Sequence, residues 1–419
     1  MKIKSLHISL TSILLFFCWQ TSYAQIDSLV FNTESAKVEE KEKNELRFDL
    51  DALAFFKDNE YNSKDVVKGY TLPGMWLTPR ISYQPLSNLK FEVGAYMLHY
   101  WGADSYPTSD FGDLSTNESG RSTKTFHCTP IFRANLQISP KVNIVLGTLY
   151  GKAYHSLTSP LFNDERCLTS DPETGVQILW NNRWFHMDTW VDWQKFIYKK
   201  DKKQEEFTYG LSTRFSPPSA KQRANVYIPL QLLMHHIGGE INTEAEERTI
   251  KTWLNAAMGV GTNIPLQARI PITLNGELTA HFFSQQKGDI LPYKKGYGIL
   301  AKAKAQIGNF SASVNYWHAD KFISIYGNPL YNALSNVDPQ MLIKRPNMFV
   351  LRGEYAQAIG RGFSWGVCLD FDLHSQKSVY RPETQTYDKG KSTTDIAAGI
   401  YLRLHPSFLI KKFKTEQTH

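Results

Sequence analysis

The chain has 419 residues, of which 42% are hydrophobic and 13% aromatic, and its formal net charge is +7. A mean hydropathy of −0.37 excludes a protein made of many membrane-spanning helices, because each such helix needs about 20 successive apolar residues. The 24 Phe, 21 Tyr and 10 Trp exclude a disordered chain. The charge is too small to indicate nucleic acid as a partner.

Residues 1–24 have the three parts of a secretory signal peptide. Lys2 and Lys4 make the basic start, residues 8–17 the apolar stretch, and Ser22-Tyr23-Ala24 a small-residue cleavage site. A lipoprotein signal is a weaker alternative, because bulky residues precede Cys18. We therefore expect an exported protein whose mature chain starts with a flexible periplasmic segment at residues 25–44.

The cysteines give no sign of a disulfide framework or a zinc site. Without Cys18 the mature chain has three, Cys128, Cys167 and Cys368, and they are far apart and odd in number, although one pair could still form. No CxxC or CxxH spacing is present. We predict no metal and no cofactor.

Apolar and polar residues alternate with period two from residue 46 onwards, which is the pattern of strands with two unlike faces. No amphipathic helix is evident after residue 45. The alternation places sixteen strands at roughly 45–56, 75–84, 89–101, 125–138, 142–152, 175–181, 183–195, 206–215, 223–236, 249–261, 268–283, 296–307, 309–318, 347–358, 362–374 and 393–405.

Long polar connections between these strands alternate with short turns. Residues 102–124 and 319–346 are examples of the long kind, and residues 139–141 and 359–361 of the short kind. Strands can cross a lipid bilayer only as a closed barrel, and bacterial outer-membrane barrels have even strand numbers, short periplasmic turns and long outer loops. The alternative is a soluble β-sandwich or propeller, but those folds do not alternate long and short connections in this way.

We therefore predict an all-β fold: an antiparallel, transmembrane, up-and-down β-barrel of about 16 strands over residues 45–405. Residues 406–419 would form a periplasmic tail. Aromatic residues such as Trp76, Trp101 and Trp193 stand near the expected strand ends, as in the aromatic girdles of membrane barrels.

The last strand adds a more specific pattern. Gly399 is followed by apolar residues at the third and fifth positions after it, Leu402 and Leu404, and the outer loops are rich in Tyr and Lys. In these features the chain resembles porin-like outer-membrane β-barrel proteins of the Bacteroidota. The resemblance implies the cell outer membrane as the location, with membrane lipid and lipopolysaccharide as partners.

One predicted strand carries a polar face that could contact a ligand. The residues sharing it are His186, Asp188, Trp190, Asp192 and Gln194. A tryptophan beside carboxylates can hold a sugar, because the ring covers C–H groups while the carboxylates accept hydroxyl hydrogen bonds. The alternative is that these side chains only form ion pairs with lumen arginines such as Arg133 and Arg214.

A second polar face, Asp370, Asp372 and His374, has three possible cation ligands at alternate positions. We favour ion pairing inside the lumen instead, because the next strand supplies Asp395 and Arg403.

These features predict a porin-like channel for small polar solutes, including glycans. The expected lumen lining also includes Arg47, Asp49 and Glu354. The alternative is a non-conducting surface barrel whose lysine-rich loops bind a polysaccharide, a secretion component or a capsule-assembly partner. His155-Ser156 and Asp164-Glu165 lie in one loop, but no catalytic signature accompanies them, so we expect that the chain is not an enzyme.

Overall fold

The structure is a computed structural model that describes residues 25–64, 66–102, 127–151, 155–217, 224–239, 248–338, 340–375, 378–381 and 386–414. The expected signal peptide at residues 1–24 lies outside the described residues. None of the described helices is long and apolar enough to cross a membrane.

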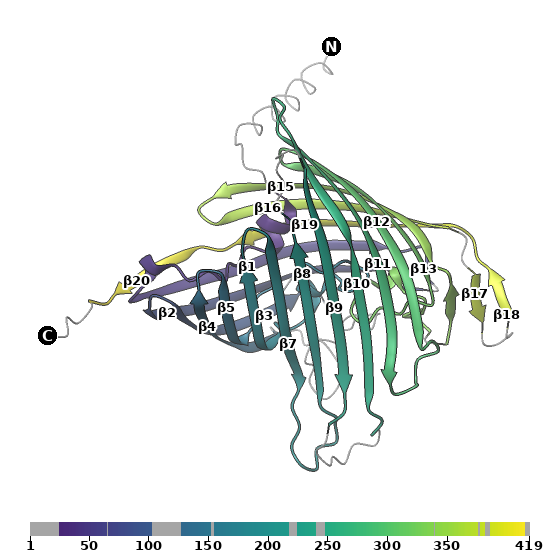
Figure 1. Cartoon of the computed structure of the whole chain (residues 1–419), viewed down its shortest axis with the longest axis horizontal. Helices are drawn as coiled ribbons and strands as arrows, with labels where there is room; N and C mark the ends of the chain where they lie inside the picture. The colour runs from purple at the N-terminus through teal and green to yellow at the C-terminus, as the bar shows by residue number, and fades with distance from the viewer. Residues whose placement is uncertain are drawn as a thin grey trace.

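Sixteen of the described strands form one closed antiparallel barrel (Figure 1). Their bounds are β1 (Glu45–Glu60), β2 (Tyr70–Leu86), β3 (Leu89–Tyr100), β4 (His127–Ser139), β5 (Val142–Thr148), β6 (Thr174–Asn181), β7 (Phe185–Lys195), β8 (Glu206–Phe215), β9 (Asn225–Ile237), β10 (Lys251–Leu266), β11 (Ile272–Lys287), β12 (Lys295–Ile307), β13 (Phe310–Asp320), β15 (Asn347–Gly360), β16 (Phe363–His374) and β19 (Thr393–Leu404). Each pairs with the next, and β19 returns to β1, with Ala52 opposite Leu404. The predicted barrel is confirmed.

The period-two pattern in the sequence becomes the two faces of the barrel wall. Along β16, Ser364, Cys368 and His374 are buried inside, while Phe363 and Leu369 are exposed on the outside. Exposed apolar side chains recur in this way on the other strands. An apolar outer surface around a closed barrel is what lipid requires, and the protein is an outer-membrane barrel, as predicted.

The two ends of the barrel differ in their connections. We call the end with the connections 87–88, 140–141, 182–184 and 361–362 the turn end, and the opposite end the loop end. The expected alternation of long and short connections is not strict, because residues 216–224 at the turn end are as many as residues 61–69 at the loop end.

The lumen is packed with chain along much of its height. Two connections from the loop end fold inward, and we call residues 149–173 the first inserted loop and residues 321–346 the second inserted loop. The first contains α2 (Arg166–Thr169) and the second η4 (Pro329–Tyr331) and β14 (Leu342–Lys344). β14 forms a small separate sheet with β17 (Ser378–Arg381) and β18 (Thr386–Lys389).

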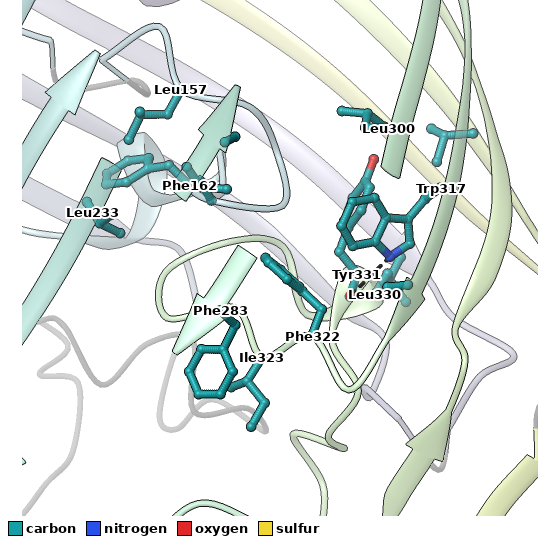
Figure 2. Packing of buried hydrophobic residues seen from close by; sticks show 14 of the residues in the cluster. Leu157, Phe162, Leu233, Phe283, Leu300, Trp317, Phe322, Ile323, Leu330 and Tyr331 are labelled. Atoms are coloured by element: carbon teal, nitrogen blue, oxygen red, sulfur yellow. Dashed lines mark hydrogen bonds between the residues drawn. The ribbon is translucent and has the colours of Figure 1, made fainter. Parts of the chain in front are cut away.

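Apolar side chains from both inserted loops meet wall residues in the middle of the barrel (Figure 2). Leu157, Phe162, Phe322 and Leu330 come from the loops, and Trp317 comes from the wall; all five are nearly inaccessible to solvent. Burial of this apolar surface stabilises the inserted position of the loops. The described lumen therefore holds closely packed side chains at this cluster.

The N-terminal segment also lies inside the barrel, which corrects the expectation of a flexible segment at residues 25–44. Ile26 and Val30 are fully buried among wall residues, around η1 (Asp27–Phe31). The backbone carbonyl of Val30 accepts a hydrogen bond of 2.9 Å from Arg403, and that of Ala36 one of 2.7 Å from Asn135. Side chains of the wall thus provide hydrogen bonds for these two carbonyl groups, which are not part of a β-sheet.

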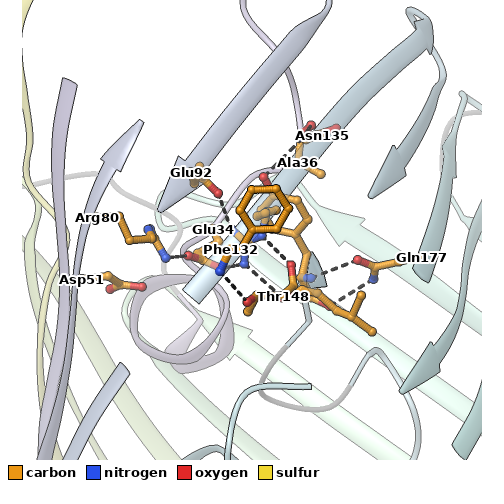
Figure 3. A network of polar contacts seen from close by, with 12 residues as sticks. Glu34, Ala36, Asp51, Arg80, Glu92, Phe132, Asn135, Thr148 and Gln177 are labelled. Atoms are coloured by element: carbon orange, nitrogen blue, oxygen red, sulfur yellow. Dashed lines mark hydrogen bonds and ion pairs between the residues drawn. The ribbon is translucent and has the colours of Figure 1, made fainter. Parts of the chain in front are cut away.

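An ion-pair network fixes the next part of this segment (Figure 3). Glu34 pairs with Arg80 and with Arg133, and Arg133 also pairs with Glu92 at 2.7 Å. Burial by itself would raise the pKa of Glu34, but Arg80 and Arg133 outweigh burial and hold that pKa well below its usual range. The carboxylate of Glu34 stays charged and keeps the segment on the wall.

Part of the predicted periplasmic tail forms a strand. Residues Ser407–Lys412 form β20, which pairs with the start of β1, Glu45 lying opposite Lys412. Figure 1 shows β20 beside β1 and β2 at the left of the view. Arg47, an expected lumen residue, donates to Ser407 of β20 at 3.0 Å and so lies where β20 pairs with β1 at the turn end.

Candidate functional site

The ten predicted ligand-contact residues point into the barrel, but they lie in separate places. They are His186, Asp188, Trp190, Asp192, Gln194, Arg133, Arg214, Asp370, Asp372 and His374. Their contact with a ligand stays a prediction.

Asp188 and Trp190 are covered by the first inserted loop. His155 Nδ1 lies 2.7 Å from a carboxylate oxygen of Asp188, and its Nε2 bonds Glu173. The imidazole of His155 stacks on the indole of Trp190 with 3.7 Å between ring centroids. A side chain at Gly210 would clash with the same indole. Trp190 is buried in this conformation, so a sugar could reach its ring only if the first inserted loop moved.

The surroundings of His155 also decide its charge. Its full burial would lower the pKa, but Glu173 and Asp188 outweigh burial and raise the pKa of His155 to about 10. At neutral pH it is therefore an imidazolium that joins the loop to the wall. A histidine in this state cannot accept a proton from Ser156, so the two residues do not form a catalytic pair.

The two arginines do not pair with the carboxylates of β7. Arg133 belongs to the Glu34 network, and the guanidinium of Arg214 lies over the ring of Tyr227, 3.6 Å from its centroid. Asp192 instead accepts a hydrogen bond of 2.8 Å from the backbone of Thr174, where the first inserted loop returns to the wall.

The residues of the second polar face form separate pairs. His374 lies 2.9 Å from Asp395, and Asp370 lies 3.4 Å from Arg352. Arg403 pairs with Asp51 at 2.7 Å and not with this face. Among the described residues, no group of three or more His, Cys, Asp or Glu side chains could hold a metal ion.

Gln194 lies near the loop end in a cluster that the sequence did not reveal. His235 Nε2 lies 3.3 Å from the carboxylate of Glu206, and its Nδ1 lies 3.1 Å from the hydroxyl of Thr208. The hydroxyl of Tyr326, from the second inserted loop, lies 2.7 Å from the same Nδ1. Gln194 Nε2 donates to this hydroxyl at 3.0 Å. We call these five residues the loop-end relay.

Three neighbouring strands position four of the five relay residues near the loop end. Gln194 lies near the end of β7, Glu206 and Thr208 near the start of β8, and His235 near the end of β9. A carboxylate, an imidazole and a hydroxyl in series are the parts of a nucleophile activated by a base. The sequence signal was weak, because alternation alone places His235 and His236 on opposite faces but does not show what either contacts.

A cavity of about 800 Å³ lies at the turn end, below the first inserted loop. Its lining includes His186, Arg214, Tyr227 and Glu277, with Ser156 from the first inserted loop. The cavity therefore reaches from the turn end of β7–β11 to the middle of the barrel.

The sequence matches the model of the lipid A 3'-O-deacylase-type family over residues 38–413, which include every strand of the barrel. The chain belongs to the lipid A 3'-O-deacylase-type family. This finding overturns the expectation that the chain is not an enzyme, because the family is named for an enzymatic activity. The expectation failed because a barrel brings catalytic groups together from different strands, with no local motif.

None of the curated proteins matches this deacylase-type chain in sequence. Solved structures with similar barrels include OccAB3 of Acinetobacter baumannii, 11% identical, with a TM-score of 0.46 over 87% of this chain and 99% of that one. OccK8 (OprE) of Pseudomonas aeruginosa is 10% identical, with a TM-score of 0.49 over 88% and 99%. OmpT of Vibrio cholerae is 6% identical, with a TM-score of 0.44 over 86% and 97%.

Proposed function

We propose that this chain removes an ester-linked acyl chain from lipid A in the outer membrane. The family match over residues 38–413 carries the proposal, since it spans the whole barrel. The packed lumen supports it, because a barrel that holds its loops inside is a rigid frame for a catalytic site.

The loop-end relay is the candidate catalytic centre. With Nε2–H donated to Glu206, the Nδ1 atom of His235 can take the proton of the Thr208 hydroxyl once the hydroxyl of Tyr326 has moved away from it. The Thr208 oxygen then attacks the ester carbonyl, and the carbon–oxygen bond to the sugar breaks as His235 returns the proton to the leaving oxygen. Water hydrolyses the acyl-enzyme in the same way.

The other two relay residues have distinct roles in this proposal. Gln194 lies next to Thr208, whose hydroxyl donates to its Oε1 at 3.3 Å, and its Nε2 would donate to the negative charge that develops on the carbonyl oxygen. Tyr326 covers Thr208 in this conformation, with 3.1 Å between their hydroxyl oxygens. Substrate would reach the centre when the second inserted loop moves this tyrosine aside.

The loop beside the relay suits an anionic lipid. Residues 196–205 join β7 to β8 and expose Phe196 and Tyr198, while Ile197 is buried and anchors the loop. The same loop exposes four lysines, Lys199, Lys200, Lys202 and Lys203. Aromatic rings at the membrane border with lysines beyond them match an acylated headgroup that carries phosphates.

The test is release of fatty acid from vesicles that contain lipid A, measured by mass spectrometry. We expect Thr208→Val and His235→Gln each to reduce the rate at least about 100-fold. Thr208→Val removes the proposed nucleophile and His235→Gln the proposed base, and neither works without the other. Thr213→Val on the outer face of the same strand is the matched control and should retain the native rate. Native rates in both relay variants would reject the relay, and no release by the native chain would reject the activity.

Passage of small polar solutes, including glycans, is a second candidate function. The observation that favours it is the polar inner face together with the cavity at the turn end. Conduction would require the inserted loops to leave the middle of the lumen. Discrete current steps of the native chain in planar bilayers would support this function, and an electrically silent barrel would reject it.

A further inference from the structure

The cavity at the turn end has features of a binding site that ester hydrolysis does not use. Gln231 lines its inner end, whereas His235 of the relay lies further along the same strand, beyond the fully buried Leu233. Thr158 of the first inserted loop donates to Gln231 at 3.0 Å, so the loop closes the cavity on this side. The two sites are separate in this conformation.

Arg214 forms no ion pair with the described residues, although the lining of the cavity also contains the acids Asp188 and Glu277. Arg214 contacts the ring of Tyr227, and no described carboxylate lies within ion-pair distance of it. The nearby acids are already bonded: Asp188 pairs with His155, and Glu277 accepts a hydrogen bond of 2.7 Å from Tyr227. A guanidinium that lines a cavity and forms no ion pair has donors available for an anionic ligand.

The remaining lining suits hydroxyl groups. Asn181, Asn225 and Asn263 provide amides, Ser212 provides a hydroxyl, and Trp184 provides an aromatic surface near the entrance. A volume of about 800 Å³ is in the range of sites for small organic molecules.

The innermost residue, Ser156, is held in an uncommon conformation. Its φ is 56°, in the left-handed region, and its side chain is exposed. Gln231 Nε2 donates to its carbonyl oxygen at 3.1 Å. Left-handed non-glycine residues persist where surrounding contacts impose them. Ser156 is thus an exposed lining residue that adds a hydroxyl to the cavity.

We propose that this cavity binds a small hydroxylated anion, a sugar carboxylate or a sugar phosphate, that enters from the turn end. Arg214 receives the anionic group, and the amides and hydroxyls of the lining receive the sugar hydroxyls. The proposal depends on neither function proposed above, because binding at this site needs neither hydrolysis nor conduction.

Calorimetric titration of the full chain in detergent, without lipid A, tests the proposal with galacturonate, glucose 6-phosphate and glucose. We expect at least one of the two anions to bind and glucose to bind at least tenfold more weakly. Tighter binding of galacturonate would identify a sugar carboxylate as the ligand class, and tighter binding of the phosphate a sugar phosphate.

Variants then locate the site. Arg214→Gln should weaken binding of the anion about tenfold to a hundredfold, because a charge-assisted hydrogen bond is lost. Arg214→Lys keeps the charge without the fork and should weaken it less. Arg269→Gln, in an exposed turn outside the cavity, is the matched control and should bind as the native chain does. Circular dichroism of each variant establishes that it is folded.

The proposal is overturned if neither anion binds the native chain, or if glucose binds as tightly as the anions. Native affinity in folded Arg214→Gln would also overturn it. If Arg214→Gln does not fold, Arg214→Met, which also removes the charge, takes its place, and native affinity in folded Arg214→Met would have the same meaning.

Discussion

The imidazole of His155 lies almost parallel to the indole of Trp190, with an interplanar angle of 10°. The histidine comes from the first inserted loop and the tryptophan from β7, so this one contact joins the loop to the wall. Two carboxylates hold the imidazole in place from its edges, Asp188 on the wall and Glu173 at the end of the loop.

Replacing this histidine should loosen the loop. His155→Gln removes the positive charge and leaves Asp188 and Glu173 next to each other without a cation. Breaking a buried ion pair in this way costs about 3–5 kcal/mol. Urea unfolding in detergent measures the loss, and a change below about 1 kcal/mol would contradict the role of His155 as the link between loop and wall.

The same histidine predicts how stability depends on pH. Its pKa is raised from 6.5 to about 10 in the folded protein, so its contribution is complete below about pH 6.5 and is lost as pH rises through 10. The difference in unfolding temperature between the native chain and His155→Gln should therefore shrink between about pH 7 and pH 10.5. A difference that stays constant over this range would show that the imidazolium is not its source.

The glycine on the other side of the indole should not tolerate a side chain. Gly210→Ala would place a Cβ against the ring of Trp190 and displace it towards His155, at a cost of about 1–3 kcal/mol. Gly353→Ala is the matched control on another strand, since no atom lies within 4 Å of its added Cβ. Equal unfolding midpoints for the two variants would argue against close packing at Trp190.

The N-terminal segment should leave the lumen when its main anchor is removed. Arg133→Ala removes one of the two arginines that pair with Glu34, leaving Arg80, and also removes the closer cation of the buried Glu92. We expect limited proteolysis to cleave residues 25–44 at least about tenfold faster than in the native chain. Lys141→Ala, in an exposed turn of the same hairpin, is the control. Native cleavage rates in Arg133→Ala would show that the ion pairs are not what holds the segment.

The hydroxyl of Tyr326 is expected to compete with Thr208 for His235. Tyr326→Phe removes the closer of the two hydroxyls, at 2.7 Å from Nδ1, and leaves the other at 3.1 Å. If the loop-end relay hydrolyses the ester, release of fatty acid should rise a few-fold. A fall of tenfold or more would instead mean that the tyrosine takes part in the reaction.

The sequence predicted the barrel because the wall obeys a local rule. Each strand alternates between two surroundings, lipid and lumen, so residues such as Leu369 and Asp370 reveal their faces from their order alone. The same rule does not extend to residues 25–44 or 407–412. Their positions depend on contacts with distant strands, such as that of Val30 with Arg403.

For the candidate sites too, alternation predicted which way a side chain faces but not which residues it contacts. Alternation indicated correctly that Asp188, Trp190 and Gln194 face inward. It did not indicate that His155 covers Trp190, or that Glu206, Thr208 and His235 meet, because these contacts join residues from different strands and loops.

By itself the sequence determined a closed outer-membrane barrel, since lipid accepts no unpaired backbone and fixes the face of every second residue. Only the tertiary structure decided that loops and the N-terminal segment occupy the lumen. It also decided which polar residues bind His155, which form the loop-end relay and which line the cavity at the turn end. The physical reason is that the inserted segments gain their stability from buried apolar surface and ion pairs with strands far away in sequence, and no local pattern records those partners.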